Sequence, residues 1–225
     1  MQSVALNAAE EESIEALKRW WDENGKQLAL LVLVVFGGYT AWILWQNSQA
    51  SNSEQSSNLY EEILNLAAVE PGVQIDQADR LRIRELATDL RENYSGSVYA
   101  RYASLFSAQQ AVALNDLEAA EAELQWILDN TSSGIFSAPD QGLSLTASLR
   151  LGRVILARGD AERALVLVNS LDPGEFEAGF AELRGDIYAA MGRLVDARDA
   201  YLAAQQAGSG SDALRMKLNE LADQG

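Results

Sequence analysis

Cysteine and histidine are absent from this chain of 225 residues. Ser-His-Asp and Cys-His catalysis, zinc fingers, iron–sulfur clusters and ordinary haem ligation all need a thiolate or an imidazole, so the composition excludes them. Disulfides are excluded as well, and cysteine usage therefore says nothing about the redox compartment. The carboxylates are left as the main candidates for acid–base or metal chemistry.

The chain carries 33 acidic and 17 basic residues, a net charge of −16. Glu118, Glu121 and Glu123 are closely spaced, but no loop spaces its oxygens like an EF-hand and no pattern places two carboxylates in one apolar cleft. We interpret them as solvated helix faces and predict no catalytic residue, no metal ligand and no cofactor. The acidity also argues against a nucleic-acid partner, because phosphate binding needs a clustered basic face.

An uncharged stretch of 18 residues runs from Leu28 to Trp45, with the sequence LALLVLVVFGGYTAWILW. A helix of this length spans about 27 Å, close to the roughly 30 Å of a bilayer's hydrocarbon core. Trp20 and Trp21 precede the stretch, and two further tryptophans lie at its far end, as is typical of interfacial aromatic belts. We therefore predict a transmembrane helix at 27–46 rather than a buried core helix.

A cleaved signal peptide is the alternative to a permanent anchor, because residues 48–50, Ser-Gln-Ala, form an acceptable cleavage site. The apolar run is longer than the usual signal-peptide core of about 7–15 residues, and the preceding 26 residues include several glutamates. We favour an uncleaved single-pass anchor.

Orientation follows from the basic residues in the short flanks of the span. Lys18, Arg19 and Lys26 precede it, and the next basic residue is Arg80. The positive-inside rule counts lysines and arginines, so residues 1–26 are predicted to be a cytoplasmic tail. The residues after position 50 are then translocated, and they hold 14 basic against 27 acidic residues, a net charge of −13.

The predicted tail has an apolar stripe that ends at Asn24-Gly25, a helix stop signal. The stripe consists of Ile14, Leu17, Trp20 and Trp21. It indicates either a short amphipathic helix at the inner membrane surface or a poorly ordered tail whose tryptophans anchor the span.

The polar segment at 47–57 is predicted to be a linker, and residues 58–225 a domain outside the cytoplasm. Beyond the span, apolar residues recur at spacings of three and four residues, as on one face of a helix, and alternating strand patterns are absent. The predicted helices lie at 54–69, 75–93, 98–114, 117–130, 142–158, 161–170, 175–191, 194–207 and 211–223.

Two segments of the domain, 149–171 and 182–204, repeat one pattern with an offset of 33 residues. An earlier copy lies 44 residues before the first, and its 11 extra residues fit a loop around 132–142. Each copy has a small residue, a turn residue, a second small residue and a bulky residue. The three sets are Ala108, Asn115, Ala120 and Leu124; Gly152, Gly159, Ala164 and Val168; and Gly185, Gly192, Ala197 and Tyr201.

This spacing describes two antiparallel helices joined by a tight turn. Small residues allow close approach of the helices, Gly or Asn accepts positive φ in the turn, and the bulky residue fills the joint. The tetratricopeptide repeat is built in this way. We predict an all-α fold, in which an N-terminal transmembrane helix is followed by a tetratricopeptide-like, right-handed superhelix with positive φ at Gly159 and Gly192.

Four stretches of the chain carry a resemblance to a known family: ALKRWWDENGK at 16–26, LQWILDN at 124–130, ELRGDI at 182–187 and LRMKL at 214–218. With the order of the other features, the chain resembles the YfgM family, the ancillary SecYEG translocon subunits of Gram-negative bacteria. The resemblance implies a bacterial inner-membrane protein with a periplasmic tetratricopeptide-like domain. It also implies association with the SecYEG translocon and the chaperone PpiD, in the handling of secreted client proteins.

The first helix of each repeat lines the concave face of such a superhelix, which is therefore the predicted partner-binding face. Its residues are Tyr102, Leu105, Gln109 and Val112 in the first copy, Thr146, Leu149, Arg153 and Leu156 in the second, and Glu182, Asp186 and Ala189 in the third. The mixture of apolar and polar groups suits an extended or helical protein segment. The alternative is that the C-terminal helix packs its leucine stripe into this face.

Two functional classes follow from these patterns. One is a membrane-anchored, non-enzymatic binding scaffold or co-chaperone, docked at the translocon or, alternatively, serving envelope assembly unrelated to secretion. The other is an enzyme that uses carboxylates alone, which the missing nucleophile–base pairs disfavour.

Overall fold

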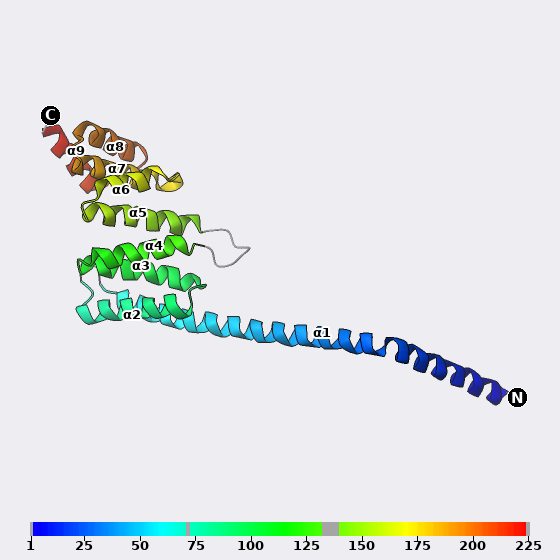
Figure 1. Cartoon of the computed structure of the whole chain (residues 1–225). Helices are drawn as coiled ribbons and strands as arrows, with labels where there is room; N and C mark the ends of the chain where they lie inside the picture. The colour runs from blue at the N-terminus through cyan, green and yellow to red at the C-terminus, as the bar shows by residue number, and fades with distance from the viewer. Residues whose placement is uncertain (1, 71–72, 132–139, 224–225) are drawn as a thin grey trace. The chain divides into compact units, whose positions relative to one another are not determined.

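The computed structural model describes residues 2–70, 73–131 and 140–223, and these contain helices and connecting segments but no β-strand. The chain divides into two compact units, Met1–Ser53 and Glu54–Gly225. The first helix, α1 (Gln2–Ala67), contributes to both units (Figure 1). The predicted all-α fold is confirmed.

Within the first unit, α1 contains the segment Ser13–Leu44, which is long and apolar enough to cross a membrane. Most of its described apolar side chains are exposed, including Leu30, Leu33 and Phe36, each at about two-thirds or more of its surface. A core helix of a soluble protein would bury such side chains. A helix that satisfies its own backbone and presents apolar groups outward is suited to lipid.

The predicted helix stop at Asn24-Gly25 is wrong, because α1 continues through both residues. One glycine in a helix interior costs only about 1 kcal/mol relative to alanine, which a long favourable sequence on either side outweighs. The Asn24 side chain donates to the carbonyl of Trp20 at 3.0 Å instead of capping a helix end. The Trp21 indole lies against Gly25, where an added Cβ would be 3.2 Å from its Nε1.

The segment at 47–57, predicted to be a linker, is also helical. Serine, asparagine and glutamine disfavour a helix only weakly, and no glycine or proline occurs between Gly38 and Pro71. Without such a breaker the helix runs on to Ala67 and ends before Pro71. Residues 54–67 of α1 therefore form the first helix of the second unit.

The other helices of the second unit agree with the predicted ranges to within about two residues. They are α2 (Gln77–Asn93), α3 (Val98–Ala113), α4 (Leu117–Asp129), α5 (Gln141–Ala157), α6 (Ala161–Asn169), α7 (Glu177–Ala190), α8 (Leu194–Gln206) and α9 (Asp212–Asp223), with a 3-10 turn at Gly174–Phe176. Side-chain caps explain most of the starts, because Asp76, Ser97, Asp116, Asp140 and Asp160 each accept from a backbone N–H in the first turn. The predicted loop around 132–142 lies mostly outside the described residues.

The turns between paired helices confirm the repeat register. The backbone φ angles at Asn115, Gly159 and Gly192 are 60°, 87° and 74°. The same backbone bond closes each turn: the N–H groups of Asp116, Asp160 and Arg193 donate to the carbonyls of Ala111, Ile155 and Tyr188 at 2.8, 3.2 and 2.8 Å. This is the hydrogen bond of a left-handed helix C-cap, repeated in all three copies.

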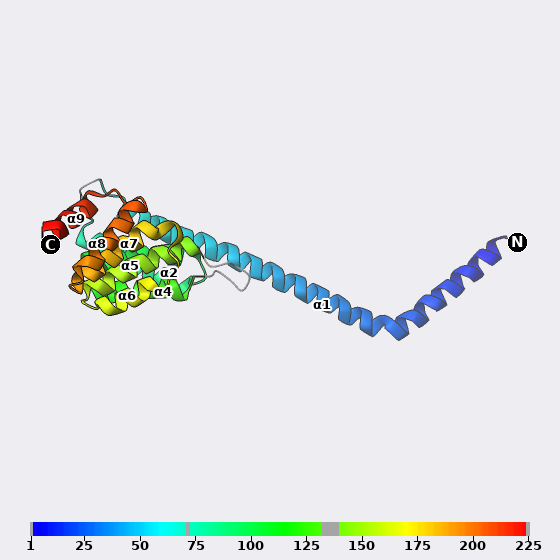
Figure 2. The same cartoon turned by 90° about the horizontal axis from the view of Figure 1, so that it is seen from above.

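Helices α2 to α9 stack in chain order within the second unit, each packed on the next, and α5 also packs on α7 (Figures 1 and 2). The small and bulky repeat positions meet as predicted. Ala108, Ala120, Ala164 and Ala197 are buried, as are Leu124, Val168 and Tyr201. The largest core cluster extends from α3 to α7, and smaller clusters lie at the α1–α2–α3 end and at the α7–α8–α9 end.

We expect Gly159→Val to lower the free energy of unfolding by about 1–2 kcal/mol or more. A β-branched residue is strained at a φ of 87°, and an added Cβ would meet no other atom within 4 Å, so strain is the main cost. Gly159→Asn is the matched control and should lose much less, because Asn tolerates this region, as Asn115 does in the first copy. Urea unfolding followed by circular dichroism measures both, and equal losses would contradict the strain argument.

Candidate protein-binding face and its pocket

The predicted face residues of the first repeat lie on α3, and they separate into two kinds. Tyr102 packs beside the end of α1, with its ring 6.4 Å from that of Tyr60. Leu105 is buried in the main core cluster and is not available at the surface for a partner. Gln109 and Val112 are exposed, and both line a hollow.

The second repeat shows the same division on α5. The Thr146 hydroxyl donates to the carbonyl of Gly142 in its own helix, at 2.8 Å. Leu149 and Leu156 are half-buried against the main core. Arg153 is exposed and lines the same hollow as Gln109 and Val112. Three of the predicted residues therefore meet at one place, and the others serve mainly the packing.

In the third repeat the C-terminal helix occupies the predicted face. The Lys217 ammonium of α9 lies 2.9 Å from Glu182 Oε1 and 2.6 Å from Asp186 Oδ1. Ala189 packs against the cluster that contains Leu214, Leu218 and Leu221 of α9. The alternative in which the C-terminal helix fills the face is therefore what the structure shows in the third copy, where α9 caps the stack.

The contact of α9 with α7 and α8, which we call the C-terminal cap, contains two groups with shifted pKa values, Tyr201 and Lys217. The Tyr201 hydroxyl donates to Asp186 at 2.8 Å, and burial, followed by this bond, raises the pKa of Tyr201. Burial alone would lower the pKa of Lys217, but its hydrogen bonds to Asp186 and Glu182 outweigh that effect and raise it. Tyr201 and Lys217 both hold their protons more tightly in the folded protein than in the unfolded chain.

We expect the C-terminal cap to make the protein less stable at alkaline pH, seen as a lower melting temperature. Because both folded-state pKa values exceed the ordinary values of 10.0 and 10.5, the stabilisation is complete below about pH 10 and declines as the pH rises further. Tyr201→Phe should reduce this alkaline sensitivity, since it removes one of the two protons. Melting temperatures of both proteins from pH 7 to 11 test this, and parallel curves would contradict it.

A pocket of about 490 Å³ opens between α3, α4 and α5. Its apolar lining is Ala108, Val112, Leu117, Leu124, Val154 and Ala157, and its polar lining is Gln109, Arg150 and Arg153. The volume lies within the roughly 300–1,000 Å³ of typical ligand sites. We call it the α3–α5 pocket.

Two arginines give the α3–α5 pocket its charge. Arg150 and Arg153 are three residues apart on α5 and therefore neighbours on one face of the helix. Arg150 Nη1 donates to the carbonyl of Leu105 at 3.4 Å, and neither arginine forms an ion pair with any residue that the structure describes. Burial, together with the charge of Arg153, lowers the pKa of Arg150.

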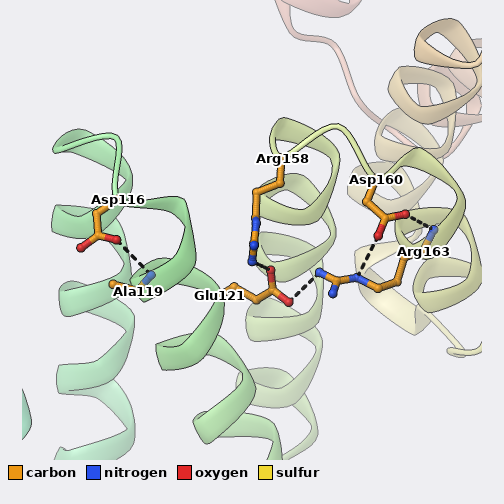
Figure 3. A network of polar contacts seen from close by, with 6 residues as sticks. All are labelled: Asp116, Ala119, Glu121, Arg158, Asp160 and Arg163. Carbon is orange, nitrogen blue, oxygen red and sulfur yellow. Dashed lines mark hydrogen bonds and ion pairs between the residues drawn. The ribbon is translucent and has the colours of Figure 1, made fainter.

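Two carboxylates of α4 and its cap pair with arginines other than Arg150 and Arg153, and Figure 3 shows the pairs of Glu121. Glu121 lies between Arg158, which pairs with its Oε2, and Arg163, whose Nη2 is 2.5 Å from its Oε1. Asp116 caps α4 and pairs with Arg84 at 3.0 Å. Neither Asp116 nor Glu121 therefore forms an ion pair with the two arginines of the pocket.

Of the three glutamates predicted to lie on solvated helix faces, Glu123 is the exception. It is only 7% exposed, accepts a hydrogen bond from the Ser107 hydroxyl at 3.1 Å, and pairs with Arg91 at 3.1 Å. Its position on α4 faces α2 and α3 rather than water. Among the described residues no group of three or more acidic side chains could hold a metal ion.

Sequence reasoning found Gln109, Val112 and Arg153 but missed Arg150 and the α4 side of the pocket. The predicted face used only the first helix of each repeat. It therefore omitted α4, the second helix of the first repeat, which supplies Leu117 and Leu124. One available signal was the arginine pair at 150 and 153, because basic residues are scarce in this acidic domain.

Stacked antiparallel helix pairs with a side pocket define a helical-repeat scaffold of the tetratricopeptide class. A family model described as a tetratricopeptide repeat-like domain matches residues 18–223. The chain belongs to the family of ancillary SecYEG translocon subunits. It is 32% identical over 220 residues to the subunit of Haemophilus influenzae, covering 97% of this chain and all of that protein.

Two further relatives carry the same name. The Escherichia coli subunit is 30% identical, and the match covers 94% of this chain and 96% of that protein. The Neisseria gonorrhoeae subunit is 26% identical, and the match covers 97% of this chain and all of that protein. No solved structure matches the chain. The family model and the names of the relatives point to a non-catalytic protein, and the apolar segment in α1 fits an inner-membrane protein.

Proposed function

We propose that this protein is a membrane-anchored, non-enzymatic scaffold that associates with the SecYEG translocon and binds protein partners on its tetratricopeptide-like domain. The similarity over nearly the full chain to ancillary SecYEG translocon subunits carries the proposal. The α3–α5 pocket supports a binding role, because it combines an apolar surface with two arginines that form no ion pair among the described residues.

The proposal includes a topology. Residues 1–26 form a cytoplasmic tail, 27–46 cross the inner membrane, 47–57 connect the span to the domain as part of α1, and 58–225 form a periplasmic domain. Lys18, Arg19 and Lys26 support this orientation, because the flank on the other side has no basic residue before Arg80. Protease added to spheroplasts should degrade the domain and leave the tail protected, whereas a mature protein that begins near residue 51 would contradict the anchor.

The proposed role is that of a co-chaperone for secreted proteins, working with the periplasmic chaperone PpiD. Affinity purification of the full chain in a mild non-ionic detergent, followed by mass spectrometry, tests this. SecYEG subunits and PpiD should be recovered together with the protein. Recovery of other envelope proteins without translocon subunits would contradict the proposal and favour a scaffold for envelope assembly.

A further inference from the structure

We propose that the α3–α5 pocket binds an acidic, apolar segment of a partner protein, with a large apolar side chain in the hollow and a neighbouring Asp or Glu side chain on Arg150 and Arg153. This deepens the proposed function and rests on it, since it assigns a chemistry to the protein segments that the scaffold binds.

The apolar half of the proposal comes from the pocket lining. Six of the nine lining residues are apolar, and they come from three different helices. Val112, at the rim of the pocket, has 46% of its surface exposed. Covering it with an apolar side chain removes this surface from water, which is the main driving force for association.

The two arginines of the pocket are the reason to expect an acidic side chain in the bound segment. The domain after position 50 has a net charge of −13, and nine of its 14 basic residues form ion pairs among the described residues. Arg150 and Arg153 are not among the nine. Asp116 pairs with Arg84, and Glu121 pairs with Arg158 and Arg163 (Figure 3 shows the Glu121 pairs), so a carboxylate from a partner would supply the counter-charge for Arg150 and Arg153.

The surroundings of Arg150 support the same conclusion. A guanidinium has five N–H donors, and the one described hydrogen bond of Arg150 is a long one to the Leu105 carbonyl. Arg150 lies at the exposed surface of α5, and the like charge of Arg153 on the same face repels it. An anion held in front of both arginines would offset the repulsion and use donors in the planar geometry that suits carboxylates.

A protein segment fits this site better than a lipid headgroup. The net charge of −13 opposes a bilayer surface and an acidic segment alike, but a short segment limits this repulsion because it places one carboxylate on the arginines and one apolar side chain in the hollow. Because Arg153 and Val112 are exposed at the mouth, a chain can pass across the pocket without either end entering it.

The test uses the full chain in a non-ionic detergent and a fluorescent peptide, Gly-Ser-Glu-Leu-Phe-Asp-Glu-Leu-Ser-Gly, acetylated and amidated so that its only charges are side chains. Fluorescence anisotropy should show saturable binding that weakens with added salt. The double variant Arg150→Gln with Arg153→Gln should bind at least about tenfold more weakly. Arg198→Gln is the matched control, because Arg198 on α8 is exposed and lies away from the pocket, and it should bind within about twofold of the wild type.

Two further comparisons separate the apolar and charged contributions. Replacing the peptide's acidic residues by lysine, or its leucine and phenylalanine residues by serine, should each weaken binding at least tenfold. Val112→Glu places a carboxylate at the rim beside the arginines and should block the peptide while circular dichroism and the melting temperature show a folded protein.

No saturable binding by the wild type, equal binding of the lysine peptide, or an equal loss in Arg198→Gln would overturn the proposal. Saturable binding of soluble dihexanoyl phosphatidylglycerol by the wild type, with no binding of the peptide, would also overturn it, in favour of a headgroup site. Translocon recovery is measured separately on the same variants. Peptide binding without translocon recovery contradicts the proposed function alone, and translocon recovery without peptide binding contradicts the pocket assignment alone.

Discussion

We expect Gly185→Ala to lower the free energy of unfolding by about 2–3 kcal/mol, a large change for a single methyl group. A Cβ at this position would lie 2.3 Å from two atoms of the Tyr201 ring, far inside van der Waals contact. Tyr201 is buried, and its hydroxyl is held by Asp186, so the ring cannot easily move away. Overpacking of this kind typically costs about 1–3 kcal/mol and outweighs the better helix propensity of alanine.

Gly152→Ala is the matched control, because Gly152 occupies the same slot one repeat earlier. Its added Cβ would meet the tip of the Leu183 side chain at 2.8 Å, which can shift more easily than a ring. We expect a change within about 1 kcal/mol there. Thermal unfolding should show a fall of roughly 5–10 °C for Gly185→Ala. A second change, Tyr201→Leu, should make Gly185→Ala nearly neutral, and additive losses would contradict the proposed contact.

We expect Arg91→Met to cost about 3 kcal/mol, because it leaves the Glu123 carboxylate buried without its cationic partner. Arg91 also lies over the Trp126 ring at 6.0 Å, and the methionine retains part of that packing. The double variant Arg91→Met with Glu123→Gln should recover most of the loss, since a neutral amide can still accept from the Ser107 hydroxyl.

The control for this pair is Arg193→Met. Arg193 also forms an ion pair, with Asp196 at 2.6 Å, and also lies over a ring, that of Tyr188 at 4.5 Å, but both partners in the ion pair are about half exposed. An exposed pair contributes about 0–1 kcal/mol, so the loss should be small. Urea unfolding of the four proteins measures the difference. Equal losses in Arg91→Met and Arg193→Met would show that burial of Glu123 does not matter.

The helix ends were predictable because the chain marks them locally. Asp76, Asp116 and Asp160 are the N-caps of α2, α4 and α6. The turns between paired helices contain Asn or Gly at the positions with positive φ. The errors arose where a local signal was weak. A single glycine at Gly25 and a polar run at 47–57 do not end a helix without a stronger breaker, so α1 is longer than predicted.

The face residues were harder to predict, because their environment depends on helices distant in sequence. Glu182 and Asp186 look like available surface charges until Lys217, more than 30 residues later, is placed against them. Leu105 has the spacing of a surface position but is buried by the α4 and α5 contacts of the main core.

By itself, the sequence determined the class of the protein: an apolar segment long enough to span a membrane, followed by helical repeats whose period, turns and small residues follow from backbone geometry and side-chain volume. Only the tertiary structure decided which charges remain unpaired. Arg150 and Arg153 are ordinary surface arginines in the sequence, and they define the α3–α5 pocket because folding pairs Glu121 with Arg158 and Arg163 instead. Ion pairing depends on distances between separate helices, and a local pattern does not contain those distances.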